Sequence, residues 1–158
     1  MKVDIDYTFV PYSNDDYKFV YETKKVVYKK YVEENWGKWD EQVQLEMFNN
    51  FIKEYGKEIK IIVSNNQKIG FWHGEMLSDG NYEIGNICII PDYQGKGLGT
   101  EILKNILKQH QYQDVYLRFF KSNPVVNLYK RLGFKICEEL PYHFKMVKEK
   151  SKIKLNEK

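Results

Sequence analysis

The stretch from Ile87 to Leu107 joins a β-branched apolar run to a helical pattern through a turn that contains three glycines. The apolar run stops at Pro91, and Leu98, Ile102 and Ile106 then recur at helical spacing. The glycines allow a sharp turn with bare backbone N–H groups, and a helix N-terminus adds partial positive charge beside them. This strand–loop–helix unit is a cradle for an anion, best suited to a phosphate or pyrophosphate.

Two common phosphate loops do not fit this stretch. A Walker loop needs Ser or Thr after the lysine, whereas Gly97 follows Lys96. A dinucleotide fingerprint needs a different glycine spacing directly after the strand. The remaining pattern is Gln-x-x-Gly-x-Gly at Gln94, Gly97 and Gly99, and it resembles the acetyl-CoA loop of the GNAT N-acetyltransferase superfamily. The alternative is a glycine-rich connector without a ligand.

Composition indicates one folded domain. The chain has 158 residues and is 42% hydrophobic, enough for a core and too apolar for a disordered chain. The net charge is +3, and residues 148–158 hold five Lys and two Glu, so the body of the chain is neutral. We therefore expect no nucleic-acid partner. The expected domain is 1–147, followed by a solvated, partly disordered Lys-rich tail at 148–158.

The pattern of apolar residues predicts the order β-α-α-β-β-β-α-β-α-β-β, a mixed sheet with helices on both faces. Asp40 and Asn123 are predicted to cap helices, and Pro124 to occupy the first position of the last helix. The predicted strands lie near 3–9, 59–63, 69–73, 82–90, 115–119, 134–139 and 142–147, and the helices near 17–32, 41–55, 98–110 and 124–132.

The second half of the chain strengthens the resemblance to GNAT enzymes. It contains Lys-Ser-Asn-Pro at 121–124 and Leu-Tyr-Lys-Arg-Leu-Gly-Phe at 128–134, which resemble the K-x-N-P…L-Y-x-R-L-G-F signature of bacterial members. Trp-Gly-Lys-Trp-Asp-Glu at 36–41 resembles a segment that precedes the second helix in some of them. The resemblance implies the GNAT fold, an α+β class with a mostly antiparallel sheet of six to seven strands.

The resemblance also implies acetyl-CoA as the co-substrate. Pantetheine would pair with a free strand edge, and the pyrophosphate would bind in the cradle. The implied residues are Ile87, Cys88 and Ile89 at the edge, Gln94, Gly95, Lys96, Gly97, Leu98, Gly99 and Thr100 in the cradle, and Asn123 and Tyr129 further along the chain. The side chains of the edge residues indicate only a buried strand, so ligand edge and core remain alternatives.

The reaction implied is transfer of an acetyl group to a primary amine by direct attack. Tyr129 is the candidate general acid, because a tyrosine hydroxyl is protonated at neutral pH and can protonate a thiolate; the alternative is an ordinary core tyrosine. Glu83 is the candidate general base, acting through a water, and strand alternation places it on one face with Ile87. The alternative is a surface glutamate.

The acceptor pocket is less clear in the sequence. Aromatic walls and a carboxylate suit a cationic amine, and the candidates are Trp36, Trp39, Asp40, Trp72 and His73. Trp36 and Trp39 are equally suited to joining the two helices. The three histidines show no metal-ligand spacing, so we expect no metal. Cys88 has no adjacent base and is not expected to act as a nucleophile.

The leading hypothesis is therefore a cytoplasmic acetyl-CoA-dependent N-acetyltransferase. Two cysteines favour a reducing compartment, and no apolar run approaches the roughly 18 residues of a membrane span. The acceptor would be a small-molecule or peptide amine, and the protein a monomer or a homodimer. The alternative is a non-catalytic CoA-binding module that acts as a sensor or partner-docking domain. A longer acyl group is a further possibility.

Overall fold

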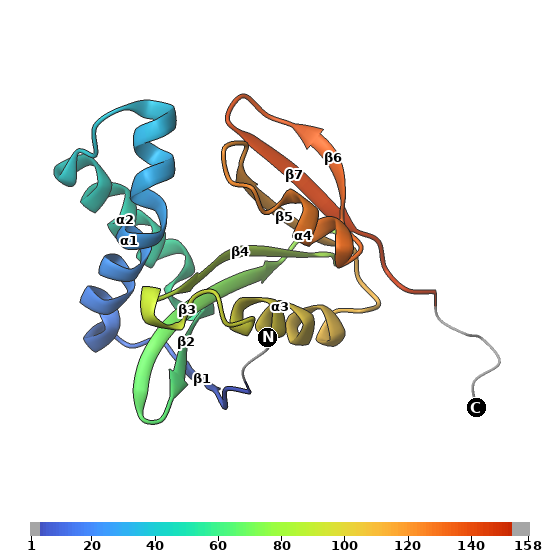
Figure 1. Cartoon of the computed structure of the whole chain (residues 1–158), viewed down its shortest axis with the longest axis horizontal. Helices are drawn as coiled ribbons and strands as arrows, with labels where there is room; N and C mark the ends of the chain where they lie inside the picture. The colour runs from blue at the N-terminus through green and yellow to red at the C-terminus, as the bar shows by residue number, and fades with distance from the viewer. Residues whose placement is uncertain (1–3, 153–158) are drawn as a thin grey trace. The chain divides into compact units, whose positions relative to one another are not determined.

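The computed structural model describes residues 4–152 (Figure 1). Within them the strands and helices follow the predicted order. Their bounds are β1 Thr8–Pro11, α1 Tyr17–Trp36, α2 Glu41–Tyr55, β2 Ile59–Ser64, β3 Gln67–Met76, β4 Tyr82–Ile89, α3 Leu98–Gln109, β5 Val115–Phe120, α4 Val126–Arg131, β6 Lys135–Glu139 and β7 His143–Lys148.

The strands form a seven-stranded sheet in the order β1-β2-β3-β4-β5-β7-β6. The pair β4–β5 is parallel, whereas β1–β2, β2–β3, β5–β7 and β6–β7 are antiparallel. The parallel pair is possible because α3 provides the long crossover connection that such strands require. The predicted class, a mixed and mostly antiparallel sheet with helices, is confirmed.

The chain divides into two compact units, which we describe separately. Unit 1 contains residues 4–74 and 85–100, and unit 2 contains residues 75–84 and 101–152. Strands β3 and β4 each contribute residues to both units. Helix α3 begins in unit 1 and continues in unit 2.

The core of unit 1 lies where α1 and α2 pack against the strands. Val20 and Phe48 from the two helices contact a cluster that includes Ile61, Phe71 and Cys88 from β2, β3 and β4, all at most 2% exposed. Each strand presents alternate residues to one face, so the apolar positions meet the apolar stripes of both helices. This packing holds α1 and α2 on one face of the unit 1 strands (Figure 1).

Local sequence signals explain where these helices begin. Ser13 and Asp16 form a capping box at the short 3₁₀ turn that leads into α1. The Asp40 side chain accepts a hydrogen bond from Val43 N at the start of α2, as predicted. Several bounds differ from the prediction, among them those of α1 and β1. Helix α1 extends to Trp36 rather than 32, and β1 begins at Thr8 rather than residue 3, with residues 1–3 outside the described range.

Unit 2 contains the β5–β7–β6 ladder and α4. The prediction that Asn123 caps this helix is wrong, because α4 begins at Val126 and Val125 is the N-cap, without a side-chain bond. The Asn123 N–H instead donates to Phe120 O in the turn that follows β5. The first residues of the Lys-rich tail contact unit 2, because Lys150 N donates to Asp114 Oδ1 and Ser151 N donates to Gln111 O. The rest of the tail, 153–158, lies outside the described residues.

Within residues 4–152, every helix is too short or too polar to cross a membrane.

Candidate functional site

The predicted cradle lies in unit 1, between the end of β4 and the start of α3. A single 3₁₀ turn at Pro91–Tyr93 follows the strand, and residues 94–97 then lie exposed before Leu98 becomes buried at the first helical position. Gly95 and Gly97 adopt φ values of 74° and 81°. Residues with a side chain rarely adopt this backbone conformation, so the loop depends on glycine at both positions.

Open space surrounds two of the three glycines of this loop. A Cβ atom added to Gly95 or Gly99 would meet no atom of the chain within 4 Å. Both positions therefore leave room for a ligand to approach the backbone at the N-terminus of a 12-residue helix. Lys96 adds a cation, with its Nζ 5.6 Å from the ring centroid of Tyr93. The exposed backbone, the positive helix end and the lysine fit a pyrophosphate group.

The side chain of Gln94 has a role that the sequence pattern does not reveal. Its Nε2 donates a 2.8 Å hydrogen bond to Ile89 O, the carbonyl of the last residue of β4. This contact closes the turn between strand and helix. The Gln94 side chain therefore shapes the loop, and its backbone N–H donates a 3.1 Å hydrogen bond to Pro91 O.

The predicted cofactor edge, Ile87–Ile89, is the last part of β4. Cys88 is fully buried, and burial raises the pKa of its thiol to about 12. The thiol is therefore protonated at neutral pH and a poor nucleophile. The position of Cys88 in the unit 1 core explains this inertness, and its side chain contributes packing rather than chemistry.

His73 lies inside unit 1, on β3. It is 6% exposed, and its ring contacts Phe51 and Tyr55 of α2 at centroid distances of 4.9 and 5.2 Å. Its Nδ1 accepts a 3.3 Å hydrogen bond from Asn86 N. Burial, and then the charge of Lys24, lower the pKa of His73 to about 4. The imidazole is consequently neutral at physiological pH and braces the backbone of β4.

The alternation of side chains along β4 is interrupted within unit 1. A Cβ added to Gly85 would lie 2.1 Å from His73 Cε1, so Gly85 faces the side on which α2 packs. Cys88 faces the same side, because it belongs to the core formed with α1 and α2. Strict alternation would put residues three apart on opposite faces. The expectation that Glu83 and Ile87 share a face because they are four positions apart therefore does not follow from strand alternation alone.

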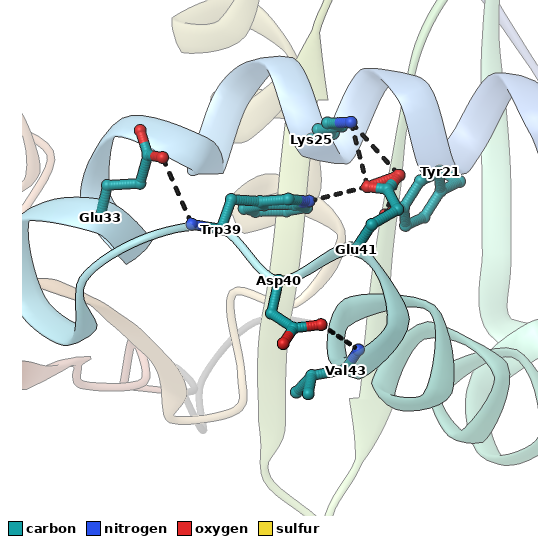
Figure 2. Close-up of polar contacts among 7 residues, drawn as sticks. All are labelled: Tyr21, Lys25, Glu33, Trp39, Asp40, Glu41 and Val43. Atoms are coloured by element: carbon teal, nitrogen blue, oxygen red, sulfur yellow. Dashed lines mark hydrogen bonds and ion pairs between the residues drawn. The ribbon is translucent and has the colours of Figure 1, made fainter.

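Trp39 and Asp40 belong to a polar cluster that joins α1 to α2 (Figure 2). The Glu41 carboxylate accepts hydrogen bonds from three donors, Tyr21 Oη at 3.0 Å, Lys25 Nζ at 3.0 Å and Trp39 Nε1 at 2.9 Å. Lys25 Nζ also lies 5.8 Å from the Trp39 ring centroid. Burial, together with the bond to Glu41, raises the pKa of Tyr21 to about 12. The Trp39 indole thus already contacts a cation, Lys25, and a carboxylate, Glu41, of the same chain.

The other two predicted acceptor residues differ in exposure. Trp36 is the last residue of α1 and is 51% exposed. Trp72 is 3% exposed and packs edge-on against Phe9 at 5.6 Å, while Lys60 Nζ lies 5.4 Å from its ring centroid. Trp72 is therefore a core residue of the β1–β2–β3 region.

Glu83 lies in unit 2, on β4, opposite Tyr116 of the parallel strand β5. Its Oε2 is 3.3 Å from Nε of Arg118, and the two side chains are 20% and 53% exposed. Arg118 is not evident from the sequence, because it is separated from Glu83 by 35 positions and meets it only when β4 and β5 pair. The one sequence signal for this residue was its charge, because Arg118 interrupts the otherwise apolar or aromatic strand β5.

Tyr129 lies in unit 2, on α4. Its half-buried ring packs between Phe119 and Phe134, with centroid distances of 5.4 and 5.9 Å. These contacts fix the ring from both the β5 and the β6 side of the helix. Asn123 lies in the loop between β5 and α4 and is half-buried. Among the described residues, no group of three His, Cys, Asp or Glu side chains could hold a metal ion.

Comparison with known proteins identifies relatives of part of the chain. It is 36% identical over 76 residues to the [Ribosomal protein bS18]-alanine N-acetyltransferase of Haemophilus influenzae, which covers 46% of the chain and 51% of that protein. It is 38% identical over 84 residues to the spermine/spermidine N(1)-acetyltransferase of Bacillus subtilis strain 168, covering 49% and 55%. The chain thus spans about half the length of these curated relatives.

The fold has solved counterparts. The crystal structure of the PaiA N-acetyltransferase of Thermoplasma acidophilum in complex with coenzyme A superposes with a TM-score of 0.68 at 17% identity, covering 92% of this chain and 99% of that one. At this identity the likeness establishes the fold. A family model described as "Acetyltransferase (GNAT) domain" matches residues 56–136, which include β4, the cradle, α3, β5 and α4. The chain therefore belongs to the GNAT acetyltransferase family.

Proposed function

We propose that this protein is an N-acetyltransferase that moves the acetyl group of acetyl-CoA to a primary amine. The observation that carries the proposal is the cradle, where exposed glycine backbone with open space meets the N-terminus of α3. Membership of the GNAT family and the names of the relatives support the same reaction. The two free cysteines are consistent with a reducing, cytoplasmic setting.

In this proposal each residue has a defined task. The backbone of residues 95–100 binds the pyrophosphate in a loop that Gln94 closes, and the N–H groups of Ile87–Ile89 bind the pantetheine amides and the oxyanion. Acetyl-CoA supplies an activated thioester. The acceptor nitrogen bonds to the acetyl carbon while the carbon–sulfur bond breaks. Glu83 takes the amine proton through a water, and the Tyr129 hydroxyl gives a proton to the departing thiolate.

Isothermal titration calorimetry with CoA tests the proposal, and Gly99→Ala makes it specific. A Cβ at Gly99 meets no atom of the chain, so the variant should fold normally and intrude only on a bound ligand. We expect CoA affinity to fall about tenfold or more, as a lost charge-assisted contact would cause. Gly56→Ala is the matched control, because its Cβ would make an ordinary 3.7 Å contact with Ile52 Cγ2.

The outcome that would reject the proposal is equally definite. Wild-type protein that binds no CoA at millimolar concentration would exclude the cradle as a CoA site. Binding that is unchanged in Gly99→Ala would place CoA elsewhere on the chain.

A second function, CoA binding without turnover, is favoured by one observation. The carboxylate proposed as the base is already engaged by Arg118. An acetyl-transfer assay against a panel of amines separates the two functions. Release of CoA thiol that depends on an added amine, and that Gly99→Ala weakens, would rule out the binding module.

A further inference from the structure

The ion pair between Glu83 and Arg118 sets the charge of the surface around the proposed base. Glu83 lies opposite Tyr116 on β5, and Arg118 follows two positions later, so strand alternation gives Tyr116 and Arg118 one face. The carboxylate is 20% exposed, whereas the guanidinium is 53% exposed. A group that approaches Glu83 therefore approaches the charged end of Arg118 as well.

The contact with Glu83 uses one nitrogen of the Arg118 guanidinium. Arginine carries five N–H donors and no acceptor, and the contact with Glu83 is made by Nε. Lys145, directly opposite Arg118 on β7, is differently placed, because its ammonium lies 4.8 Å from the Tyr116 ring centroid and Glu138 faces it from β6. Arg118 is thus the cation of this face that is best placed to bind a planar anion such as a carboxylate.

The same arrangement opposes a polycation. An acceptor amine that donates its proton toward Glu83 comes within a few ångströms of a permanent positive charge. One amine can lose its proton and become neutral, whereas the further ammonium groups of a polyamine remain charged and are repelled by Arg118.

In unit 1, two of the acceptor residues that the sequence suggested, Trp39 and Asp40, already have partners in the chain. The Trp39 ring and the Glu41 carboxylate already hold Lys25. Asp40 caps α2 through Val43 N. Trp39, Glu41 and Asp40 are therefore engaged by groups of the chain itself, which disfavours binding of a cationic acceptor at this cluster.

From these observations we infer that the acceptor is an amine that also carries a carboxylate, and that Arg118 binds this carboxylate while Glu83 receives the amine proton. The inference rests on the proposed function and names its substrate class. Two sources supply this chemistry, a free amino acid with its terminal carboxylate and a peptide N-terminus followed by an acidic side chain.

Two isosteric acceptor pairs test the inference and separate the sources. Glycine against glycinamide reports a terminal carboxylate, and Ala-Asp-Ala-amide against Ala-Asn-Ala-amide reports a side-chain carboxylate, with spermidine as the polycation. Acetyl transfer is measured as kcat/KM with wild-type protein. In one pair we expect the carboxylate member to be favoured by about tenfold, the effect of one charge-assisted hydrogen bond. Spermidine should be a poorer acceptor than that member.

Arg118→Gln tests the residue. The preference within the favoured pair should fall to about onefold through KM, because glutamine lacks the charge. This ratio does not depend on how well the variant protein carries out transfer in general. Lys135→Gln is the control, since it removes the same charge from a 3.2 Å ion pair with Glu149 elsewhere in unit 2 and should keep the preference.

Three results would overturn the inference while leaving the proposed function standing. The first is a preference for the carboxylate member that survives in Arg118→Gln. The second is a kcat/KM for spermidine above that of both carboxylate acceptors. The third is a protein that binds CoA but acetylates only those amines that lack a carboxylate. If CoA binds and no acceptor is acetylated, the inference is also wrong. Absence of CoA binding would instead reject the proposed function, and calorimetry reports that result separately.

Discussion

At the scale of single residues, two phenylalanines pack against the ring of Tyr129. Phe119 and Phe134 hold the ring, and phenylalanine would keep both contacts. We therefore predict that Tyr129→Phe folds normally, binds CoA with nearly unchanged affinity and loses about 10²-fold or more in kcat, as expected for a general acid. Steady-state kinetics and calorimetry measure the two effects. Tyr112→Phe, at a half-exposed position, is the control, and an unchanged kcat would remove Tyr129 from this role.

His73 shows how burial removes a charge from a residue that the sequence offered as an acceptor contact. Its pKa falls from 6.5 to about 4 in the folded protein. Between these values the unfolded chain binds a proton that the folded protein does not. The stability that the neutral His73 imidazole contributes is therefore fully present above pH 6.5. It is lost as pH falls toward 4, which lowers the free energy of unfolding by up to about 3 kcal/mol.

This pH dependence can be measured by urea unfolding of wild-type protein and His73→Gln between pH 7.5 and 4.5. Glutamine does not titrate, so the variant should lose less stability than wild type as pH falls. Equal slopes in both proteins would show that His73 does not titrate in this window.

At the scale of secondary-structure elements, β4 depends on the glycine beneath His73. A methyl group at Gly85 would lie 2.1 Å from Cε1 and 2.2 Å from Nε2 of the buried ring. Gly85→Ala should destabilise the fold by about 1–3 kcal/mol, the usual cost of overpacking. In a His73→Ala background the cost should largely disappear, because the clashing ring is gone. Chemical denaturation of the four proteins in this cycle measures the coupling, and additive effects would contradict the contact.

Helix α2 depends on Asp40 in a more ordinary way. Its carboxylate satisfies one of the free N–H groups of the first turn, that of Val43, at 3.1 Å. Asp40→Ala should cost about 1 kcal/mol and lower Tm by roughly 2–4 °C, whereas Asp40→Asn should stay near wild type. Thermal unfolding followed by circular dichroism measures both. If asparagine costs as much as alanine, the carboxylate has a role other than capping.

At the scale of the whole molecule, β3 and β4 each belong to both units. Unfolding of β3 or β4 in one unit would therefore disrupt a strand of the other unit as well. We therefore predict one cooperative thermal transition by calorimetry, and a Tm that rises with CoA concentration because the ligand binds the folded state. Two resolved transitions would show that the units unfold separately. Gly99→Ala should keep the single transition and lose most of the rise.

The sequence predicts this architecture because local patterns determine most of it. Alternation and helical spacing give the element order, and Asp40 lies before an amphipathic run that needs a cap. The Asn123-Pro124 pair also predicted a helix start, but this prediction is wrong, because the chain makes another turn before α4 begins at Val126. The Glu83–Arg118 and Glu41–Lys25 pairs could not be predicted, because each depends on residues that only the paired strands or packed helices bring together.

The contrast between the two cysteines has a practical consequence. Cys88 is buried in the core, and its thiol has a pKa of about 12. Cys137 lies exposed on β6. A maleimide dye should consequently attach to one position of the native protein without any mutation. The natural chain thus offers a single-site fluorescent reporter on β6, and denaturation would reveal the second thiol as a direct count of unfolded molecules.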